Sequence, residues 1–223
     1  MVDKEIELND AEEQMEKMEN HIEKSKQYWN HPDTTDLIHW IINKNAHEED
    51  TKYTLKLLEE IMLTHPMGRA LDLAAGIGRV TKYMLSKYYQ IIDLVELADN
   101  LLNEAKKDPI ILKCVGKFYC TSIQQFEYEY QYDCIAIYYV LGHLKETECM
   151  IALSKAKKNL NPNGVIILKD NISENACLHA EWVYIKRTKE KISEMVEVAG
   201  FKIILNYVEV MEGFEDGVTL LAI

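Results

Sequence analysis

One stretch constrains the fold of this chain more than any other: an apolar run that breaks into a glycine turn and then resumes with helical periodicity. The run covers residues 70–73, the turn contains Gly76 and Gly78, and the helical pattern ends near Leu85. The next apolar run, residues 91–95, is followed by the acid Glu96. A strand, a tight turn, a helix and a second strand ending in a carboxylate form the first half of a Rossmann-type nucleotide site.

The turn also narrows the class of nucleotide. Glycine permits left-handed torsions and close approach, so a ligand can lie against backbone N–H groups at the start of the helix. A dinucleotide site has a third glycine three residues after the second, and this chain has Thr81 there. The spacing instead resembles the acidic-x-Gly-x-Gly-x-Gly motif of class I methyltransferases, which bind S-adenosylmethionine. Asp72, Gly76 and Gly78 match that motif, and Ala74 stands where the first glycine is usual.

Length and cysteine usage bound the class of protein. The 223 residues suit one domain, with or without an added arm. No apolar run approaches the roughly 20 residues needed to cross a bilayer, and residues 1–5 do not begin a signal peptide. The five cysteines form no Cys-x-x-Cys pair, which favours neither a disulfide framework nor a zinc cluster. We therefore expect a cytoplasmic or nuclear protein with no membrane contact and no bound metal.

The net charge of the chain indicates which kinds of binding partner are expected. A formal net charge of −12 disfavours binding to a phosphate backbone and favours a cationic substrate. We expect no nucleic-acid partner, and a monomer or a weak dimer.

After residue 68 the chain alternates apolar strands with helical stretches, which predicts an α/β fold: a Rossmann-like sheet of seven strands, mostly parallel, covered on both faces. The parallel strands are predicted at 69–74, 91–97, 115–121, 132–140 and 164–170. Helices are predicted at 79–87, 99–107, 145–160 and 186–199, with a turn at 161–164 and a left-handed cap at Gly200. The last two strands are an antiparallel C-terminal hairpin at the sheet edge, formed by residues 201–210 and 217–223.

The N-terminal region differs from the rest. Residues 1–26 are highly charged and predict a solvated helix or a frayed terminus. Residues 28–45 carry too many large apolar side chains for a free linker, and residues 51–63 predict a helix before the first strand. We divide the chain into an N-terminal helical arm, 1–63, and a cofactor-binding domain, 64–223.

Ligands of open α/β sheets lie beyond the carboxyl ends of the strands. Ile123 and Gln124 follow the third predicted strand, and Tyr138, Tyr139 and His143 lie at and after the end of the fourth. Asn171 follows the fifth. These residues are therefore candidates for a binding site.

Four segments together resemble the protein α-N-terminal methyltransferase family: Leu71 through Arg79, Gly142-His143-Leu144, Asn161-Pro162-Asn163-Gly164 and Lys169-Asp170-Asn171. With Tyr28-Trp29, the resemblance spans about residues 28–200. It implies methylation of the α-amino group of proteins that begin X-Pro-Lys or X-Pro-Arg, with S-adenosylmethionine as donor and S-adenosylhomocysteine as product. The expected partner is the basic N-terminal peptide of a protein.

The resemblance also implies roles for single residues. Trp29 and Tyr139 would line or cover the peptide site, Asn171 would hold the amine, and His143 would receive its proton. Glu181, which the family pattern does not place, is a second candidate for receiving that proton. The cofactor would contact Asp72, Ala74, Gly76, Arg79, Glu96, Ile123, Gln124 and Tyr138.

Some positions depart from the family pattern. Tyr139 replaces a tryptophan, residues 37–41 are bulky where the family has glycines, and the aspartates expected soon after Asn171 are absent. Within residues 175–182, Glu181 is the only acid and His179 the only ordinary base. Two alternatives stay open: a methyltransferase for a small molecule or another protein acceptor, and a noncatalytic cofactor-binding relative.

Overall fold

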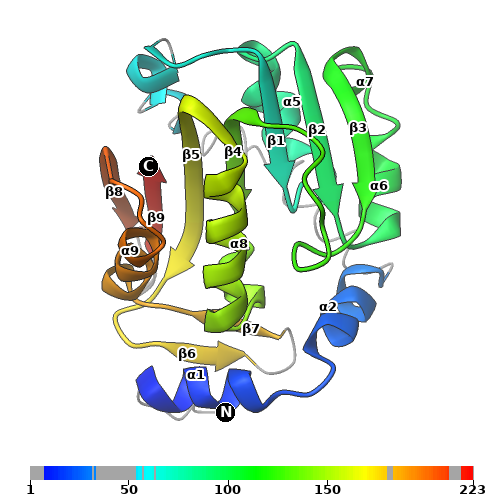
Figure 1. The fold of residues 1–223 in the computed structure, drawn as a ribbon. Coiled ribbons are helices and arrows are strands. Elements are labelled where there is room, and N and C mark those ends of the chain that lie inside the picture. Colours follow the sequence, from blue (N-terminus) through cyan, green and yellow to red (C-terminus); the bar gives the residue numbers. More distant parts are fainter. Residues whose placement is uncertain are drawn as a thin grey trace. The chain divides into compact units, whose positions relative to one another are not determined.

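The structure is a computed structural model that describes residues 8–31, 33, 54–56, 58–62, 64–179, 183–210 and 217–222. The chain divides into two compact units, whose helices and strands are labelled in Figure 1. We call one the glycine-turn unit, residues 26–136 and 159–166, and the other the asparagine unit, residues 1–25, 137–158 and 167–223. The strands β4 (Tyr132–Tyr138) and β5 (Leu160–Ile172) run through both.

Parallel strands form the core of the glycine-turn unit. β1 (Arg69–Leu73), β2 (Ile91–Glu96) and β3 (Val115–Cys120) lie side by side, with Arg69 opposite Ile91 and Ile92 opposite Val115. Every residue of β2 after Ile91 is buried, as expected of a strand inside a parallel sheet. The three predicted strands of this region are confirmed to within one residue.

The helices of this unit are shorter than predicted. The helix expected at 79–87 is broken into α5 (Arg79–Tyr83) and a 3₁₀ turn, η1 (Leu85–Lys87), because Met84 leaves the helical region with φ −124° and ψ −67°. α6 (Asp99–Ala105) follows β2. The short α7 (Ile111–Cys114) was not predicted from the sequence, and the Asp108 carboxylate accepts hydrogen bonds at its start.

The sheet order is β3-β2-β1-β4-β5-β9-β8, so five parallel strands are continued by an antiparallel hairpin. The hairpin strands are β8 (Leu205–Val210) and β9 (Gly217–Ala222), and β9 pairs antiparallel with β5. This confirms the C-terminal hairpin at the sheet edge. β4 ends at Tyr138, two residues earlier than predicted, because Tyr139 takes a left-handed φ of 54°. β5 begins at Leu160, so the predicted turn at 161–164 is wrong, although Asn163, with φ 63°, bends the strand there.

A short ribbon and two helices precede the C-terminal hairpin in the asparagine unit. A two-stranded ribbon, β6 (Cys177–His179) and β7 (Tyr184–Lys186), has no counterpart in the sequence prediction. The helix predicted from residue 186 begins later, as α9 (Lys189–Val198), because the Thr188 hydroxyl caps it by accepting from Lys191 N. Gly200, with φ 85°, confirms the left-handed cap. The helix predicted at 145–160 is α8 (Glu146–Lys158).

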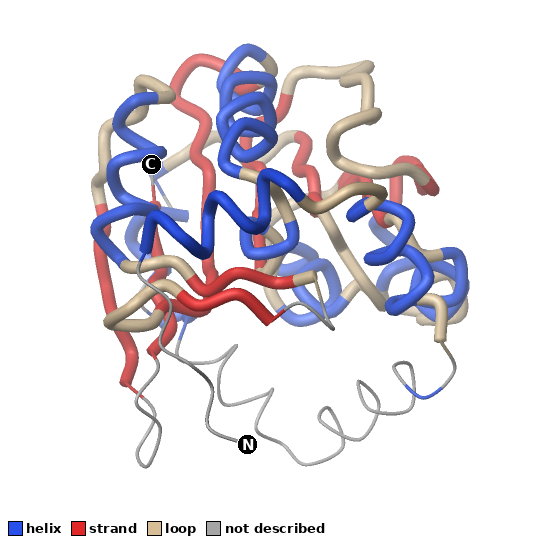
Figure 2. Tube along the Cα trace, turned by 90° about the horizontal axis from the view of Figure 1, so that it is seen from below, coloured by secondary structure: helices blue, strands red, loops and turns tan. Residues whose placement is uncertain are grey.

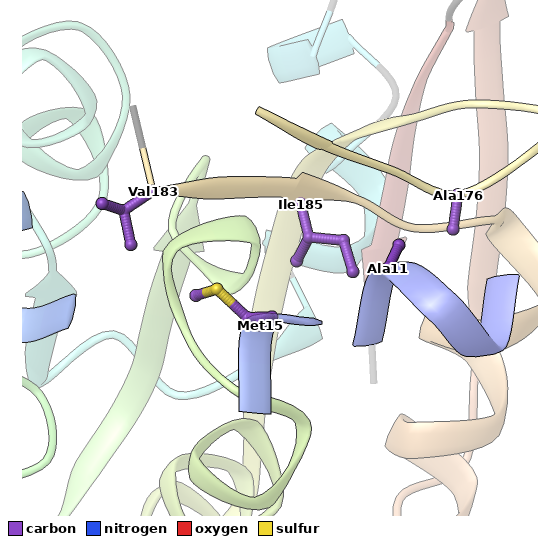
Figure 3. Close-up of a cluster of buried hydrophobic side chains, with 5 residues drawn as sticks. All are labelled: Ala11, Met15, Ala176, Val183 and Ile185. Carbon is purple, nitrogen blue, oxygen red and sulfur yellow. The ribbon is translucent and has the colours of Figure 1, made fainter. Parts of the chain in front are cut away.

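The N-terminal helices are α1 (Leu8–Lys17) and α2 (His21–Trp29). Figure 2 shows α1 lying along the β6–β7 ribbon. A buried apolar cluster joins them, formed by Ala11, Met15, Ala176, Val183 and Ile185 (Figure 3). The prediction of a solvated or frayed terminus is therefore wrong for α1.

The remaining N-terminal predictions are only partly covered by the structure. Residues 54–56 and 58–62 are helical, as expected, and Leu58 and Met62 are fully buried. The bulky segment 37–41 lies outside the described residues, and the domain boundary at residue 63 stays a prediction. No helix within the described ranges has the length and apolar character needed to span a bilayer.

Candidate functional site

The turn after β1 has the backbone that its glycines predict. Gly76 and Gly78 have left-handed φ values of 56° and 77°. An added Cβ at Gly78 would overlap the Ile111 side chain and lie 3.3 Å from Ala105 and Leu94, whereas one at Gly76 would meet nothing within 4 Å. Gly78 is therefore required for packing, and Gly76 leaves space beside the turn.

Ala74 shows that the missing first glycine of the motif does not change the backbone. Its φ is 70°, a left-handed conformation that disfavours a side chain by about 1–2 kcal/mol. The turn is held against β2, because Ala75 N donates to the Val95 carbonyl over 2.9 Å.

Asp72 is a buried carboxylate that caps the start of α5. Its Oδ2 accepts from Thr81 N at 3.0 Å and from the Thr81 hydroxyl at 2.6 Å. Gly78 precedes α5 and has no side chain to cap it, so Asp72 supplies the acceptor from β1. Burial raises the pKa of Asp72 to about 6, opposed by Thr81 and by the positive charge of Arg79. Thr81, which argued against a dinucleotide, is the partner of this acid.

Glu96 connects the glycine turn with the loop after β2. Its Oε2 accepts from Gly76 N at 2.7 Å and its Oε1 from Ala98 N at 2.8 Å. Burial raises the pKa of Glu96, while these N–H donors act in the opposite direction. An ionised carboxylate has about four acceptor positions, so Glu96 can accept further hydrogen bonds from vicinal hydroxyls.

The predicted contacts after β3 lie at the same edge of the sheet as Glu96. Thr121 N donates to the Glu96 carbonyl over 3.0 Å. Ile123 and Gln124 follow in a turn closed by Phe126 N, which donates to the Ser122 carbonyl at 2.9 Å. Ile123 is 8% exposed, and Gln124 is half-buried.

Trp29 belongs to the same unit. Its carbonyl accepts from Asn100 Nδ2 at 3.0 Å, and Asn100 N donates to Asn30 Oδ1 at 3.3 Å. Asn100 lies in the first turn of α6, four residues after Glu96. The end of α2 is therefore tied to the helix that follows the acidic residue.

These residues fit a nucleoside of the S-adenosylmethionine type. Gly76 leaves open space against backbone N–H groups, Glu96 offers carboxylate acceptors, and Ile123 offers an apolar surface.

In the asparagine unit, Asp170 is the central acceptor. Its Oδ2 accepts from Leu141 N at 2.8 Å, and its Oδ1 accepts from Asn171 N at 2.8 Å and from the Tyr184 hydroxyl at 2.7 Å. Burial raises the pKa of this carboxyl, while the Tyr184 hydroxyl and the backbone donors lower it. Asp170 thereby joins the end of β5 to the turn after β4 and to β7.

Tyr184 brings together two of the predicted catalytic residues. Its oxygen accepts from Asn171 Nδ2 at 2.9 Å. Its ring lies 4.7 Å from that of His143, centroid to centroid, inclined by 62°. An added Cβ at Gly142 would overlap the same ring, so Gly142 is required for this approach.

A hydrogen bond at the ring nitrogen Nδ1 orients the side chain of His143. Nδ1 lies 3.0 Å from the Val183 carbonyl, which can only accept, so Nδ1 carries a proton. In the neutral imidazole the lone pair then resides on Nε2. Val183 has a φ of 51°, unusual for a β-branched residue, and this strained backbone presents its carbonyl to His143.

Tyr138 and Tyr139 mark the end of β4. Tyr138 is 8% exposed, and the two rings meet edge to face at 6.2 Å. Tyr139 N donates to the Lys169 carbonyl over 2.7 Å, which fixes the turn toward His143. Glu181, the third predicted catalytic residue, lies outside the described residues.

Sequence reasoning missed Tyr184 and Arg187. Arg187 is 1% exposed and forms a two-pronged ion pair with Glu12 of α1, with Nε–Oε1 at 2.6 Å and Nη2–Oε2 at 3.0 Å. It also donates to the carbonyls of Leu141 and Leu144, on either side of His143. No spacing rule links these residues, so their only sequence signal was membership of the segment after Asn171.

Comparisons with known proteins agree on one family. The model of the AdoMet dependent proline di-methyltransferase family matches residues 17–216. The N-terminal Xaa-Pro-Lys N-methyltransferase 1-B of Xenopus laevis is 32% identical over 203 residues, which cover 86% of this chain and 89% of the relative. The N-terminal Xaa-Pro-Lys N-methyltransferase 1 of Mus musculus is 30% identical over 191 residues, covering 81% of this chain and 84% of the relative.

Solved structures show the same fold. A SAM-dependent methyltransferase from Leishmania major matches with a TM-score of 0.79 at 24% identity, covering 91% of this chain and 83% of that one. DhpI in complex with SAH matches with a TM-score of 0.69 at 15% identity, covering 92% and 97%. The Rossmann-like methyltransferase fold expected from the glycine turn is therefore confirmed.

Proposed function

This chain belongs to the AdoMet dependent proline di-methyltransferase family, and we propose that its substrate is the α-amino group of proteins that begin X-Pro-Lys or X-Pro-Arg. The expectations of a methyltransferase and of S-adenosylmethionine as its cofactor are confirmed. Relatives named N-terminal Xaa-Pro-Lys N-methyltransferase support the acceptor class. The observation that carries the proposal is the side-chain amide of Asn171, whose Nδ2 is engaged by Tyr184 and whose oxygen suits an amine donor.

S-adenosylmethionine supplies a methyl group bonded to a positively charged sulfur. We assign its nucleoside to Gly76, Glu96, Ile123 and Gln124, with Glu96 accepting hydrogen bonds from the ribose hydroxyls. Asp72 and Ala74 shape the turn, and Arg79 and Tyr138 complete the proposed set. Of these, Asp72 acts through the start of α5.

Only a neutral amine can attack a methyl group, because the attack requires the nitrogen lone pair. A peptide α-amino group has a reference pKa near 8, against about 10.4 for lysine, so less is needed to remove its proton. The Asn171 oxygen accepts a hydrogen bond from the amine and aims its lone pair. His143 then receives the proton on Nε2, and Glu181 is the proposed alternative acceptor.

The peptide partner is proposed to be basic. Its attraction to the chain follows from the net charge of −12. In this proposal the helical arm 1–63 covers the substrate, Trp29 and Tyr139 line the peptide, and the complete sheet has seven strands. A monomer or weak dimer in the cytoplasm or nucleus, binding neither nucleic acid nor membrane, completes the proposal.

Mass spectrometry of a peptide panel tests the acceptor. Peptides beginning Ala-Pro-Lys and Ser-Pro-Arg should gain methyl groups in the presence of labelled cofactor, and the number of mass increments counts them. The same peptides with acetylated N-termini are matched controls and should gain none. If the protein binds the cofactor but methylates no X-Pro-Lys or X-Pro-Arg peptide, the acceptor is wrong, and the absent aspartates after Asn171 would favour a small-molecule acceptor.

A further inference from the structure

Tyr184 holds the amide of Asn171 by a hydrogen bond that can run in only one direction. We infer that Tyr184 is a positioning residue that decides which end of the Asn171 amide faces the substrate amine. The inference deepens the proposed function, since it rests on Asn171 holding that amine. Its basis is the geometry around Asp170.

Asp170 sets the direction of the hydrogen bonds. Its oxygens accept from two backbone N–H groups, those of Leu141 and Asn171, at 2.8 Å each. These contacts favour the ionised carboxylate, which has no proton to donate. The Tyr184 hydroxyl, 2.7 Å from Asp170 Oδ1, must therefore donate its single proton to it.

The tyrosine oxygen is then left as an acceptor toward Asn171. The group that faces it at 2.9 Å must be a donor, which is the amide nitrogen Nδ2. With the amide turned over, Asn171 Oδ1 would face an oxygen whose proton is already committed to Asp170. The hydrogen-bond network thus fixes which end of the Asn171 amide faces Tyr184.

This orientation decides what Asn171 can do. With Nδ2 directed at Tyr184, the other end of the amide is the carbonyl oxygen Oδ1, which accepts a hydrogen bond from an amine. The reversed amide would present N–H donors, which cannot accept from the amine and would compete for its lone pair. The Asn171 side chain has a donor end and an acceptor end, and Tyr184 therefore leaves its acceptor end for the substrate amine.

The ring of Tyr184 is itself held in place. It is 7% exposed, packs on Gly142, and meets the ring of His143 edge to face. Burial and the neighbouring Asp170 charge raise the pKa of Tyr184 well above its ordinary value, so the hydroxyl keeps the proton that it donates. The same side chain contacts the amine-holding residue and the proposed proton acceptor.

A double-mutant cycle tests this role. Tyr184→Phe keeps the ring and removes the hydroxyl, and we expect kcat with an X-Pro-Lys peptide to fall about 10- to 100-fold while the Kd for S-adenosylmethionine is unchanged. In the Asn171→Ala background the same change should have no further effect on kcat. Losses that multiply in the double variant would overturn the inference, because Tyr184 would then not act through Asn171.

Tyr132→Phe is a matched control. It removes another tyrosine hydroxyl that donates to a buried aspartate, Asp93, over 2.9 Å. This variant should lose stability but keep kcat. An equal loss of kcat in both tyrosine variants would mean that the effect is a general one of packing.

Nuclear magnetic resonance separates this inference from the acceptor assignment. The side-chain NH₂ signal of Asn171, assigned by its disappearance in Asn171→Ala, should shift and lose protection from solvent exchange in Tyr184→Phe. This measurement needs no turnover, so it remains decisive if X-Pro-Lys peptides prove not to be substrates. An unchanged NH₂ signal would overturn the inference.

Discussion

The two units hold their polar residues in place by different means. In the glycine-turn unit, Glu96 accepts hydrogen bonds from the main chain of Gly76 and Ala98, and the turn takes its shape from left-handed residues. In the asparagine unit, two long side chains at β7, Tyr184 and Arg187, hold Asn171 and the turn around His143. The first arrangement is therefore sensitive to backbone torsion, and the second to the loss of single side chains.

The largest expected effect lies in the asparagine unit. Arg187→Leu leaves the Glu12 carboxylate and the carbonyls of Leu141 and Leu144 without their buried donor. Removing one partner of a buried ion pair costs about 3–5 kcal/mol, which urea denaturation measures. Lys17→Met, which breaks the exposed pair with Glu13, is the control and should change little. A loss for Arg187→Leu as small as that of the control would contradict the dependence on single side chains.

A matched pair of glycine substitutions tests whether the glycine-turn unit is sensitive to backbone torsion. Gly76→Ala and Gly78→Ala both place a side chain at a left-handed φ, but only Gly78 also has packed neighbours. We expect the free energy of unfolding to fall by about 1 kcal/mol for Gly76→Ala and by about 3 kcal/mol for Gly78→Ala.

The two glycine substitutions should affect cofactor binding in the opposite order from stability, with the larger effect for Gly76→Ala. Calorimetry should find weaker binding of S-adenosylmethionine to Gly76→Ala, because the added methyl occupies the space beside the turn. Gly78→Ala, measured below its unfolding transition, should bind closer to normally. Equal effects of the two substitutions on both stability and affinity would show that the two glycines have no separate roles.

The smallest expected effect is a gain. Ala74→Gly relieves a left-handed φ of 70°, and the added freedom of the unfolded chain offsets part of that relief. Thermal unfolding should show a stabilisation of about 0.5 kcal/mol or less. A clear destabilisation would mean that the Ala74 methyl group makes contacts that outweigh its backbone strain.

The glycine-turn unit was largely predictable because its requirements are local. An apolar run, two glycines and an acid at the end of the next strand specify β1, the turn and β2 within about 30 residues. At Gly76 and Gly78 the left-handed backbone follows from glycine itself, and Glu96 follows from its position at the strand end. The features of this unit that were not predicted are local details, such as the break in the helix at Met84.

The asparagine unit was predictable only up to Asn171. The β6–β7 ribbon is too short to show a periodicity of two, and the high charge of the α1 sequence favoured a solvated helix over a buried one. The ion pair of Glu12 with Arg187 joins residues 175 positions apart, and Tyr184 approaches Asn171 through a ribbon that had not been predicted. Such contacts depend on tertiary structure, and no local pattern signals them.

The same ion pair has a consequence for how the chain is made. A ribosome that adds about 5–20 residues per second needs roughly 10–35 seconds to travel from Glu12 to Arg187. Throughout that interval the residues of α1 have been synthesised, but the ribbon that buries Ala11 and Met15 does not yet exist. The apolar residues of this segment have no ribbon to pack against until residues 176–185 have been made, so the docking of α1 is a late step of folding.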